Sequence, residues 1–242
     1  MAVFGIIAIA GWTRLIIEPA GVYIAYLLAL VFFLVSIIHP PIIAYRLDEL
    51  EAKPFNRAWV YVLWIVAFGF LCSLIAQNRA YLFGFEPFRI SSVSMAPTVQ
   101  PNDLVIVDTW RFRRRSPVIN DLVVFDLPGN PGTKYLYRVV GMPGDTIEIR
   151  EDVRFSNGAA IAEEFIEDSG TRAGIMSDFG PRVVPDDHYF VLGDNRHNAR
   201  DSRFIGPIHK DLLHGRVEYR WFASDDGISW SRFPARLAAD GT

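Results

Sequence analysis

The chain has 242 residues, 51% of them hydrophobic, and carries a formal net charge of −3 at pH 7. This slightly acidic balance argues against nucleic acid as a partner, since nucleic-acid-binding proteins present basic surfaces. The single cysteine, Cys72, excludes an intrachain disulfide and a cysteine metal site, and we interpret it as a packing residue in an apolar segment.

Two long stretches near the N-terminus contain no Asp, Glu, Lys or Arg, namely Pro19–Tyr45 and Ala58–Asn78. A helix needs about 20 apolar residues to cross the hydrocarbon core of a bilayer, where every backbone polar group must be paired internally. The rest of the chain is too short to enclose two such helices in a soluble core. We therefore predict a membrane anchor over residues 1–80, with two transmembrane helices and residues 2–17 as a candidate third.

The loop between these two stretches carries Arg46, Lys53 and Arg57. Short loops rich in Lys and Arg stay in the cytoplasm. The second helix would then leave the membrane on the opposite side. We therefore predict a multi-pass protein whose remaining domain, residues 81–242, lies outside the cytoplasm.

From residue 103 onward, short β-branched or aromatic runs alternate with turn residues, and no segment shows a long helical period. This pattern predicts a mostly β domain built from antiparallel sheets or a distorted barrel. The weaker pattern over residues 151–185 indicates an insertion or a small lobe. The expected strands cover residues 104–107, 122–125, 136–140, 146–149, 189–192 and 216–221.

Basic and aromatic residues alternate from Trp110 to Arg115. Such a segment is compatible with contact to anionic lipid headgroups or with a solvated loop before the next strand. A nucleic-acid contact is not favoured, because the chain as a whole is acidic.

Four segments follow the anchor in a fixed order. Together they resemble the type I signal peptidase (leader peptidase) family, and the resemblance extends from about residue 80 to the end of the chain. A single Ser-Met-x-Pro-Thr sequence would be a weak signal, whereas four ordered blocks are a strong one. The blocks are Phe88–Val99, Gln100–Val107, Tyr135–Asp145 and Gly193–Arg203.

The resemblance implies a membrane-bound serine endopeptidase with a serine nucleophile and a lysine general base, and with neither a metal nor an organic cofactor. It implies preprotein signal peptides and the lipid bilayer as partners, with cleavage after small residues. It also implies a bacterial-type inner (plasma) membrane, with the catalytic domain on the periplasmic side.

Individual residues match the motifs of the family. Ser94 matches the nucleophile, and Ser92 matches the serine whose hydroxyl completes the oxyanion hole together with a backbone N–H at the nucleophile. The shallow apolar pockets for the small side chains of the substrate correspond to Phe88, Ile90, Val105 and Leu136.

The sequence departs from the family at the general base. Tyr137 occupies the position of the lysine, and Ala199 occupies that of a serine that orients the lysine. Outside the predicted cytoplasmic loop, the chain has only two lysines. Lys210 is at a surface-like position, and Lys134 is expected to face the side of its strand opposite to Tyr137, because strand residues alternate in direction.

Three explanations of this departure remain open. Tyr137 is the base, which requires a nearby cation such as Arg138 or Arg203 to stabilise the phenolate. Alternatively, the fold brings another group to Ser94. In the third explanation, the protein is a catalytically impaired homologue that binds preproteins or a partner peptidase without cleaving them. The other groups considered as base are His197, His209 and Lys134.

Overall fold

The computed structural model describes residues 58–78, 84–163 and 178–222, together with isolated residues elsewhere in the chain. The predictions for residues 2–17, for most of the first charge-free stretch and for the loop after it lie outside the described residues. The chain divides into two compact units, Met1–Gly84 and Phe85–Thr242.

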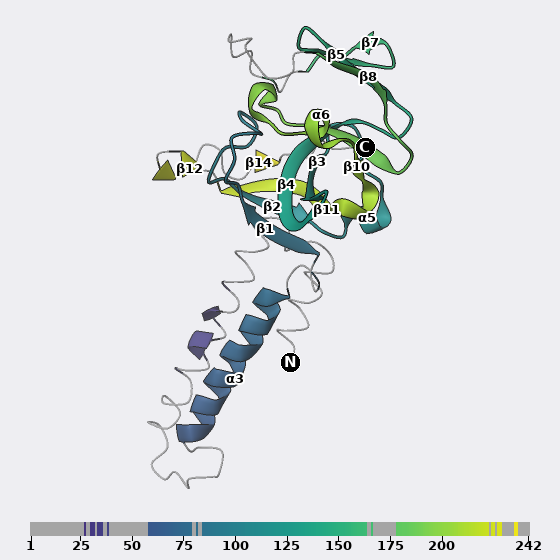
Figure 1. The fold of residues 1–242 in the computed structure, drawn as a ribbon. Coiled ribbons are helices and arrows are strands. Elements are labelled where there is room, and N and C mark those ends of the chain that lie inside the picture. Colours follow the sequence, from purple (N-terminus) through teal and green to yellow (C-terminus); the bar gives the residue numbers. More distant parts are fainter. Residues whose placement is uncertain are drawn as a thin grey trace, which may run out of the picture. The chain divides into compact units, whose positions relative to one another are not determined.

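The helix α3 spans Ala58–Gln77, within the second charge-free stretch (Figure 1). Asn78 follows the last turn of the helix, where its backbone N–H and its side-chain amide both donate to the carbonyl of Leu74, at 3.1 and 2.8 Å. Within the part of the chain that the structure describes, no helix is long and apolar enough to span a bilayer. The predicted transmembrane helices are therefore not shown.

The second unit is mostly antiparallel β-sheet, as the sequence predicts. Its main sheet has the strand order β1-β2-β11-β3-β4-β9-β10, and β14 pairs with β11. All six expected strands are confirmed, five of them in this sheet. The strands of the main sheet are β1 (Phe85–Arg89), β2 (Leu104–Asp108), β3 (Leu122–Leu127), β4 (Asn130–Gly141), β9 (His188–Leu192), β10 (Ile208–His209), β11 (Leu213–Phe222) and β14 (Ala235–Arg236).

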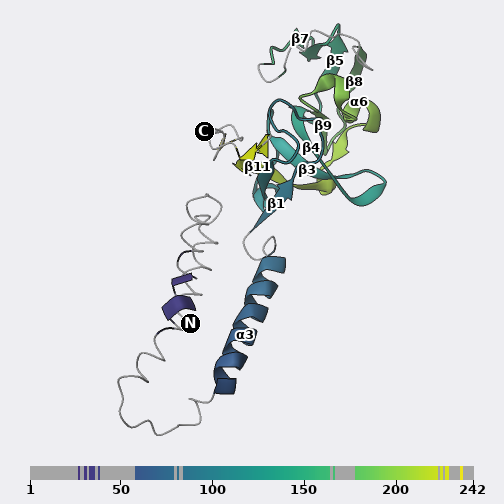
Figure 2. The same ribbon diagram turned by 90° about the vertical axis from the view of Figure 1, so that its left-hand side faces the viewer.

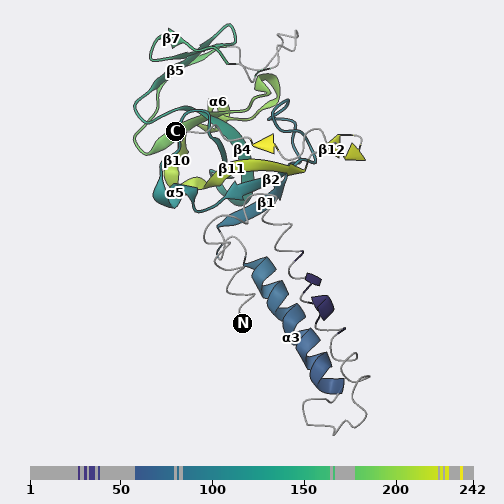
Figure 3. The same cartoon turned by 180° about the vertical axis from the view of Figure 1, so that it is seen from behind.

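A smaller sheet with the order β7-β6-β5-β8 lies at the end of this unit opposite β1 (Figures 1, 2 and 3). The region predicted as an insertion or small lobe contributes three of its strands, while β5 is the sixth expected strand. The bounds are β5 (Thr146–Arg150), β6 (Val153–Ser156), β7 (Ala159–Ala160) and β8 (Phe179–Val183). A separate pair is formed by β12 (Ser224–Asp225) and β13 (Gly227–Ile228).

Helical turns in this unit are short, and they are α5 (Arg111–Arg114), α6 (Ser202–Ile205) and the 3₁₀ turns η2 (Arg196–Asn198) and η3 (Lys210–Leu212). Within the basic–aromatic segment, for which the sequence left lipid contact and a solvated loop open, Arg111–Arg114 form the short helix α5. The side chain of Asp108 accepts the backbone N–H of Trp110 at 3.0 Å and turns the chain into this helix.

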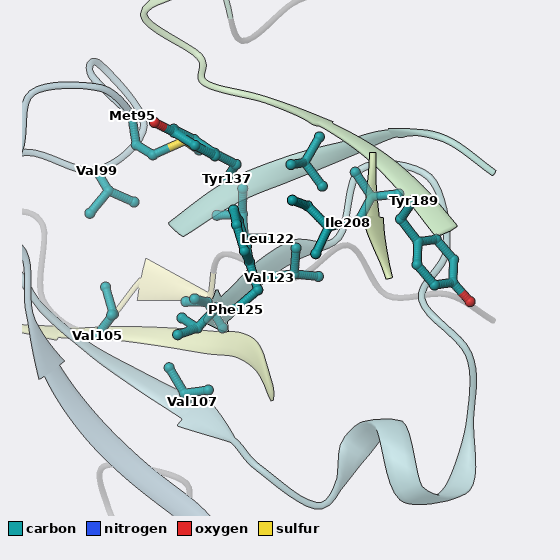
Figure 4. Packing of buried hydrophobic residues seen from close by; sticks show 14 of the residues in the cluster. Met95, Val99, Val105, Val107, Leu122, Val123, Phe125, Tyr137, Tyr189 and Ile208 are labelled. Atoms are coloured by element: carbon teal, nitrogen blue, oxygen red, sulfur yellow. The ribbon is translucent and has the colours of Figure 1, made fainter. Parts of the chain in front are cut away.

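The core of the main sheet collects the inward-facing residues of its strands, since alternate strand residues point to opposite faces. Val105, Val123, Phe125 and Val139 are fully buried there. Burying one such side chain contributes about 1.5–3 kcal/mol to folding. At one end of this cluster Tyr137 lies against Met95, the residue after the predicted nucleophile (Figure 4).

Candidate active site

Ser94 lies in the turn that connects β1 to β2, and only 8% of it is exposed. Its neighbour Met95 is 1% exposed and packs into the core, which anchors the turn. The backbone N–H of Ser94 donates to the hydroxyl of Ser92 at 3.2 Å. The predicted nucleophile and the predicted oxyanion donor are therefore held beside each other.

The segment between β9 and α6, residues 193–201, packs against this turn, and we call it the clamp. The backbone N–H of Asn195 donates to the carbonyl of Ser94 at 3.0 Å, and its side-chain amide donates to the carbonyl of Val93 at 3.3 Å. Gly193 makes the approach possible, because a Cβ there would lie 2.6 Å from the Ser94 carbonyl oxygen and 2.4 Å from Cβ of Ala199. The sequence placed these residues in the fourth block of the resemblance, but it did not indicate this contact with Ser94.

A buried ion pair fixes the clamp to the sheet. Arg138 on β4 donates to the carboxylate of Asp194 through Nε at 2.8 Å and through Nη2 at 2.6 Å. The two side chains are 8% and 1% exposed. Removing one partner of such a pair leaves the other charge buried without a partner, which lowers the free energy of unfolding by about 3–5 kcal/mol.

The end of the clamp is held by residues of the fourth sequence block. Asp201 accepts two side-chain hydrogen bonds from Arg203, at 2.8 and 2.9 Å, and one from the backbone N–H of Gly193 at 3.1 Å. The hydroxyl of Ser202 accepts the N–H of Val191 at 2.9 Å. Both acceptors are fully buried, so the segment from β9 to α6 has a fixed geometry.

Tyr137 lies next to Ser94, as its position in the third sequence block implies. It is 1% exposed, and its ring packs between Phe125 and Tyr135, with centroid distances of 5.9 and 5.8 Å. Its phenol is hydrogen-bonded to the side chain of Ser94 and to the backbone of Arg200. The group in the position of the family's base therefore does contact the predicted nucleophile.

The surroundings of Tyr137 favour a neutral phenol. Burial raises its pKa above the ordinary value, and the negative charge of Asp201 raises it further, with a smaller contribution from Tyr135. The hydrogen bonds to Ser94 and Arg200 act in the opposite direction but do not offset these effects. The structure thus opposes the ionisation that a tyrosinate base requires.

Neither of the two arginines proposed from the sequence as a stabilising cation serves Tyr137. Arg138 is paired with Asp194, and Arg203 is paired with Asp201. Strand alternation explains the first case, because Arg138 follows Tyr137 directly on β4 and points to the opposite face. The second arginine brings a carboxylate with it, and this carboxylate raises the pKa of the phenol.

The other candidate bases are engaged elsewhere. Lys134 binds the carboxylate of Asp126 at 3.2 Å and Nδ1 of His214 at 3.2 Å. His209 lies 3.4 Å from a carboxylate oxygen of Asp211, and His197 lines a pocket beside the clamp. Among the described residues, no hydrogen bond joins any of these candidate bases to Ser94.

The four residues predicted to line the substrate pockets belong to one cluster. Phe88 on β1 is paired with Val105 on β2, and Leu136 is on β4. Phe88, Ile90 and Leu136 are half-buried, whereas Val105 is fully buried beneath the surface. The ring edge of His214 contacts Phe88, with a centroid distance of 5.7 Å, which the sequence did not indicate.

Among the described residues, no group of three or more His, Cys, Asp or Glu side chains is placed to hold a metal ion. The arrangement instead offers a buried serine hydroxyl, adjacent oxyanion donors and a phenol. Such a set suits acyl transfer at Ser94, provided that a group accepts the serine proton.

Several known proteins have sequences similar to this chain. The family model for signal peptidase, peptidase S26, matches residues 61–222. Signal peptidase I P of Bacillus subtilis subsp. natto is 35% identical over 173 residues, covering 67% of this chain and 89% of the relative. Signal peptidase I of Pseudomonas aeruginosa is 33% identical over 232 residues, covering 78% and 77%. Signal peptidase I of Pseudomonas fluorescens is 31% identical over 205 residues, covering 69% and 71%. The chain therefore belongs to the signal peptidase family, peptidase S26.

Proposed function

We propose that this protein is a serine endopeptidase that removes signal peptides from exported preproteins after small residues, with Ser94 as the nucleophile. The observation that carries the proposal is the geometry around Ser94. Its turn is held by the core, by the clamp and by the Arg138–Asp194 ion pair, and its hydroxyl contacts the residue in the position of the family's base.

In the proposed reaction, Ser94 Oγ attacks the carbonyl carbon of the scissile bond while the phenolate form of Tyr137 accepts its proton. The N–H of Ser94 and the hydroxyl of Ser92, now 3.2 Å apart, donate to the oxyanion in place of their own bond. The C–N bond then breaks, and the phenol returns the proton to the leaving amine. Water hydrolyses the acyl ester and releases the signal peptide.

This mechanism makes the enzyme slow at neutral pH. The reference pKa of tyrosine is about 10, and burial raises the pKa of Tyr137 above that value. The phenolate fraction, and with it the rate, therefore increases about tenfold for each pH unit until the folded-state pKa is reached.

We further propose that the N-terminal region anchors the protein in a bacterial-type inner membrane and leaves residues 81–242 on the periplasmic side. The support is in the sequence, where the two charge-free stretches flank a loop with Arg46, Lys53 and Arg57. Signal peptides leave the membrane on that side, so anchor and substrate meet at the same surface.

A second function is favoured by the raised pKa of Tyr137. A serine beside a neutral phenol is a poor nucleophile, and the same fold can bind preproteins or a partner peptidase without cleaving them. The two functions differ only in the step that removes the Ser94 proton.

Cleavage of a preprotein by the full-length protein in detergent distinguishes the two functions. We expect slow cleavage at pH 8, faster cleavage at pH 10, and none with Ser94→Ala. Cleavage that survives Ser94→Ala contradicts the proposal. Binding of the preprotein without cleavage at any pH up to 10 establishes the second function instead.

A Tyr137→Phe variant tests the base directly. It removes the phenol and keeps the ring that packs against Phe125. We expect the pH-dependent increase in rate to disappear. An unchanged pH profile would show that another group accepts the Ser94 proton.

A further inference from the structure

A pocket of about 510 Å³ opens beside the clamp. Three arginines face it, and among the described residues none of those that line it is acidic. Such a lining attracts anions. The lining residues are Arg196, His197, Asn198, Ala199, Arg200, Arg203 and Phe204.

The charges behind this pocket are only partly balanced. Arg203 is paired with the buried carboxylate of Asp201. Arg196 shares the single carboxylate of Glu163 with Arg154, and both of these ion pairs are 2.6 Å long. Among the described residues, two buried arginines therefore share one glutamate behind the pocket.

Arg200 is the cation that this pocket offers to a ligand. It is exposed, and within the described part of the chain its guanidinium has no carboxylate partner. A guanidinium binds a carboxylate through two parallel hydrogen bonds. Phe204, with 42% of its surface exposed, adds an apolar wall for the aliphatic part of an acidic side chain.

The pocket is connected to the Ser94 turn through Ala199, which lines the pocket, and Gly193. Cβ of Ala199 lies against Gly193, which in turn lies against the carbonyl of Ser94. The backbone of Arg200 is hydrogen-bonded to the phenol of Tyr137. A peptide with its scissile carbonyl at Ser94 therefore has the pocket within reach of its neighbouring residues.

We propose that this pocket binds the carboxylate of an acidic residue that directly follows the cleavage point in the preprotein. The proposal rests on the proposed function, because it places the scissile bond at Ser94. The residues proposed for the acyl side of the substrate come from β1, β2 and β4, whereas the pocket is formed by residues 196–204. The two sets of residues meet at Ser94 and Tyr137. The residues that follow the scissile bond are therefore expected to lie on the side of the pocket.

Binding to full-length Ser94→Ala protein in detergent tests this preference. Three peptides span a signal-peptide cleavage site and differ only in having Glu, Gln or Lys at the first position after the cut. We expect the Glu peptide to bind about two- to fivefold more tightly than the Gln peptide, the range for one exposed ion pair, and the Lys peptide to bind most weakly. High salt should reduce the difference.

Arg200→Gln removes the cation and keeps the backbone N–H beside Tyr137. We expect the Glu and Gln peptides to bind this variant equally. The matched control is Arg182→Gln, an exposed arginine on β8 in the smaller sheet, and it should retain the preference. Equal binding of Glu and Gln peptides to the parent protein overturns the inference.

The inference and the proposed function fail in different ways. Cleavage of all three peptides without a glutamate preference refutes the inference and leaves the peptidase intact. If the Glu peptide binds preferentially but the parent protein, with Ser94 in place, cleaves none of the peptides, the inference about the pocket is supported and the proposed peptidase function is refuted. If Arg200→Gln instead weakens binding to vesicles of anionic lipid and leaves the peptide preference unchanged, the pocket serves the membrane and the inference is wrong.

Discussion

The residues that hold Ser94 in place and the residue that would take its proton have opposite chemical surroundings. The first group is rich in charge, and its buried charges are paired, as in Arg138–Asp194 and Arg203–Asp201. The second, Tyr137, lies in an aromatic cluster where burial favours its neutral form. Ser94 is thus held by paired charges, whereas the phenol beside it is kept neutral by burial. Four experiments test how separate these two properties are.

The largest effect is expected from returning an amine to the position of Tyr137. Tyr137→Lys combined with Ala199→Ser places a lysine and an orienting hydroxyl beside a serine that is already held in position. A working general base contributes about 10²–10⁴-fold to the rate, so we expect cleavage at pH 7 to rise by that factor.

Preprotein cleavage from pH 6 to pH 10 measures this gain. The matched control is Thr133→Lys, which puts an amine on an exposed residue of the same strand and should give no gain. An unchanged rate in the double variant would mean that Ser94 is not positioned for attack, and the comparison between the two regions would fail.

The next largest effect is expected in the clamp. Arg138→Met leaves Asp194 buried without its partner, so we expect the free energy of unfolding to fall by about 3–5 kcal/mol. Denaturant unfolding of the full chain in detergent measures this loss.

Lys134→Met is the matched control on the same strand. Its partner Asp126 is 30% exposed, so breaking that pair should cost at most about 1 kcal/mol. Equal losses in the two variants would contradict the view that the Arg138–Asp194 pair anchors the clamp.

Gly193→Ala tests the contact between clamp and nucleophile. The added Cβ would lie 2.6 Å from the carbonyl oxygen of Ser94, so the turn must move. A displacement of about 1 Å at a reacting group can lower the rate about 100-fold, and overpacking costs about 1–3 kcal/mol.

Cleavage at pH 10 measures the loss of rate, and unfolding measured in parallel gives the loss of stability. Gly69→Ala in α3, where a Cβ meets nothing within 4 Å, is the control and should leave cleavage unchanged. Full activity of Gly193→Ala would show that the clamp does not determine the position of Ser94.

The smallest effect concerns pH and stability. Folding raises the pKa of Tyr137, so the folded protein keeps a proton that the unfolded chain releases above pH ~10. The stability from this residue is fully present below pH ~10 and is lost as the pH rises towards the folded-state pKa, by at most about 1.4 kcal/mol per pH unit.

Unfolding measurements between pH 8 and pH 11 test this slope. Tyr137→Phe has no phenol to ionise, so it should lose less stability over that range than the parent protein. Identical slopes would show that the pKa of Tyr137 is not raised by folding.

The sequence predicted the architecture of the sheets well, because short apolar runs bounded by turn residues, such as 122–125 and 189–192, are typical of buried strands. It missed β1, where Pro87 and Glu86 interrupt the apolar pattern, although the strand pairs regularly with β2. The strands β6, β7 and β8 of the smaller sheet were also missed, since residues 151–185 show only a weak strand pattern.

The site was predicted only as far as local sequence reaches. The motifs located Ser94 and Tyr137, but the environment of the phenol depends on Asp201, which is 64 residues further along the chain. The pairing of Arg138 with Asp194 spans 56 residues, and no local rule gives such a partner. Alternation along β4 could have excluded Arg138 as a neighbour of the phenol.

Because Gly193 has no Cβ, three other residues of the site can pack closely around one small space. The backbone of Ser94, the methyl group of Ala199 and the ring of Tyr137 all border the space that a Cβ would occupy. A larger group at any one of these positions takes room from the others, so their substitutions should be strongly non-additive. Positions 137 and 199 should therefore be exchanged together, because single substitutions at either one would understate the effect of the pair.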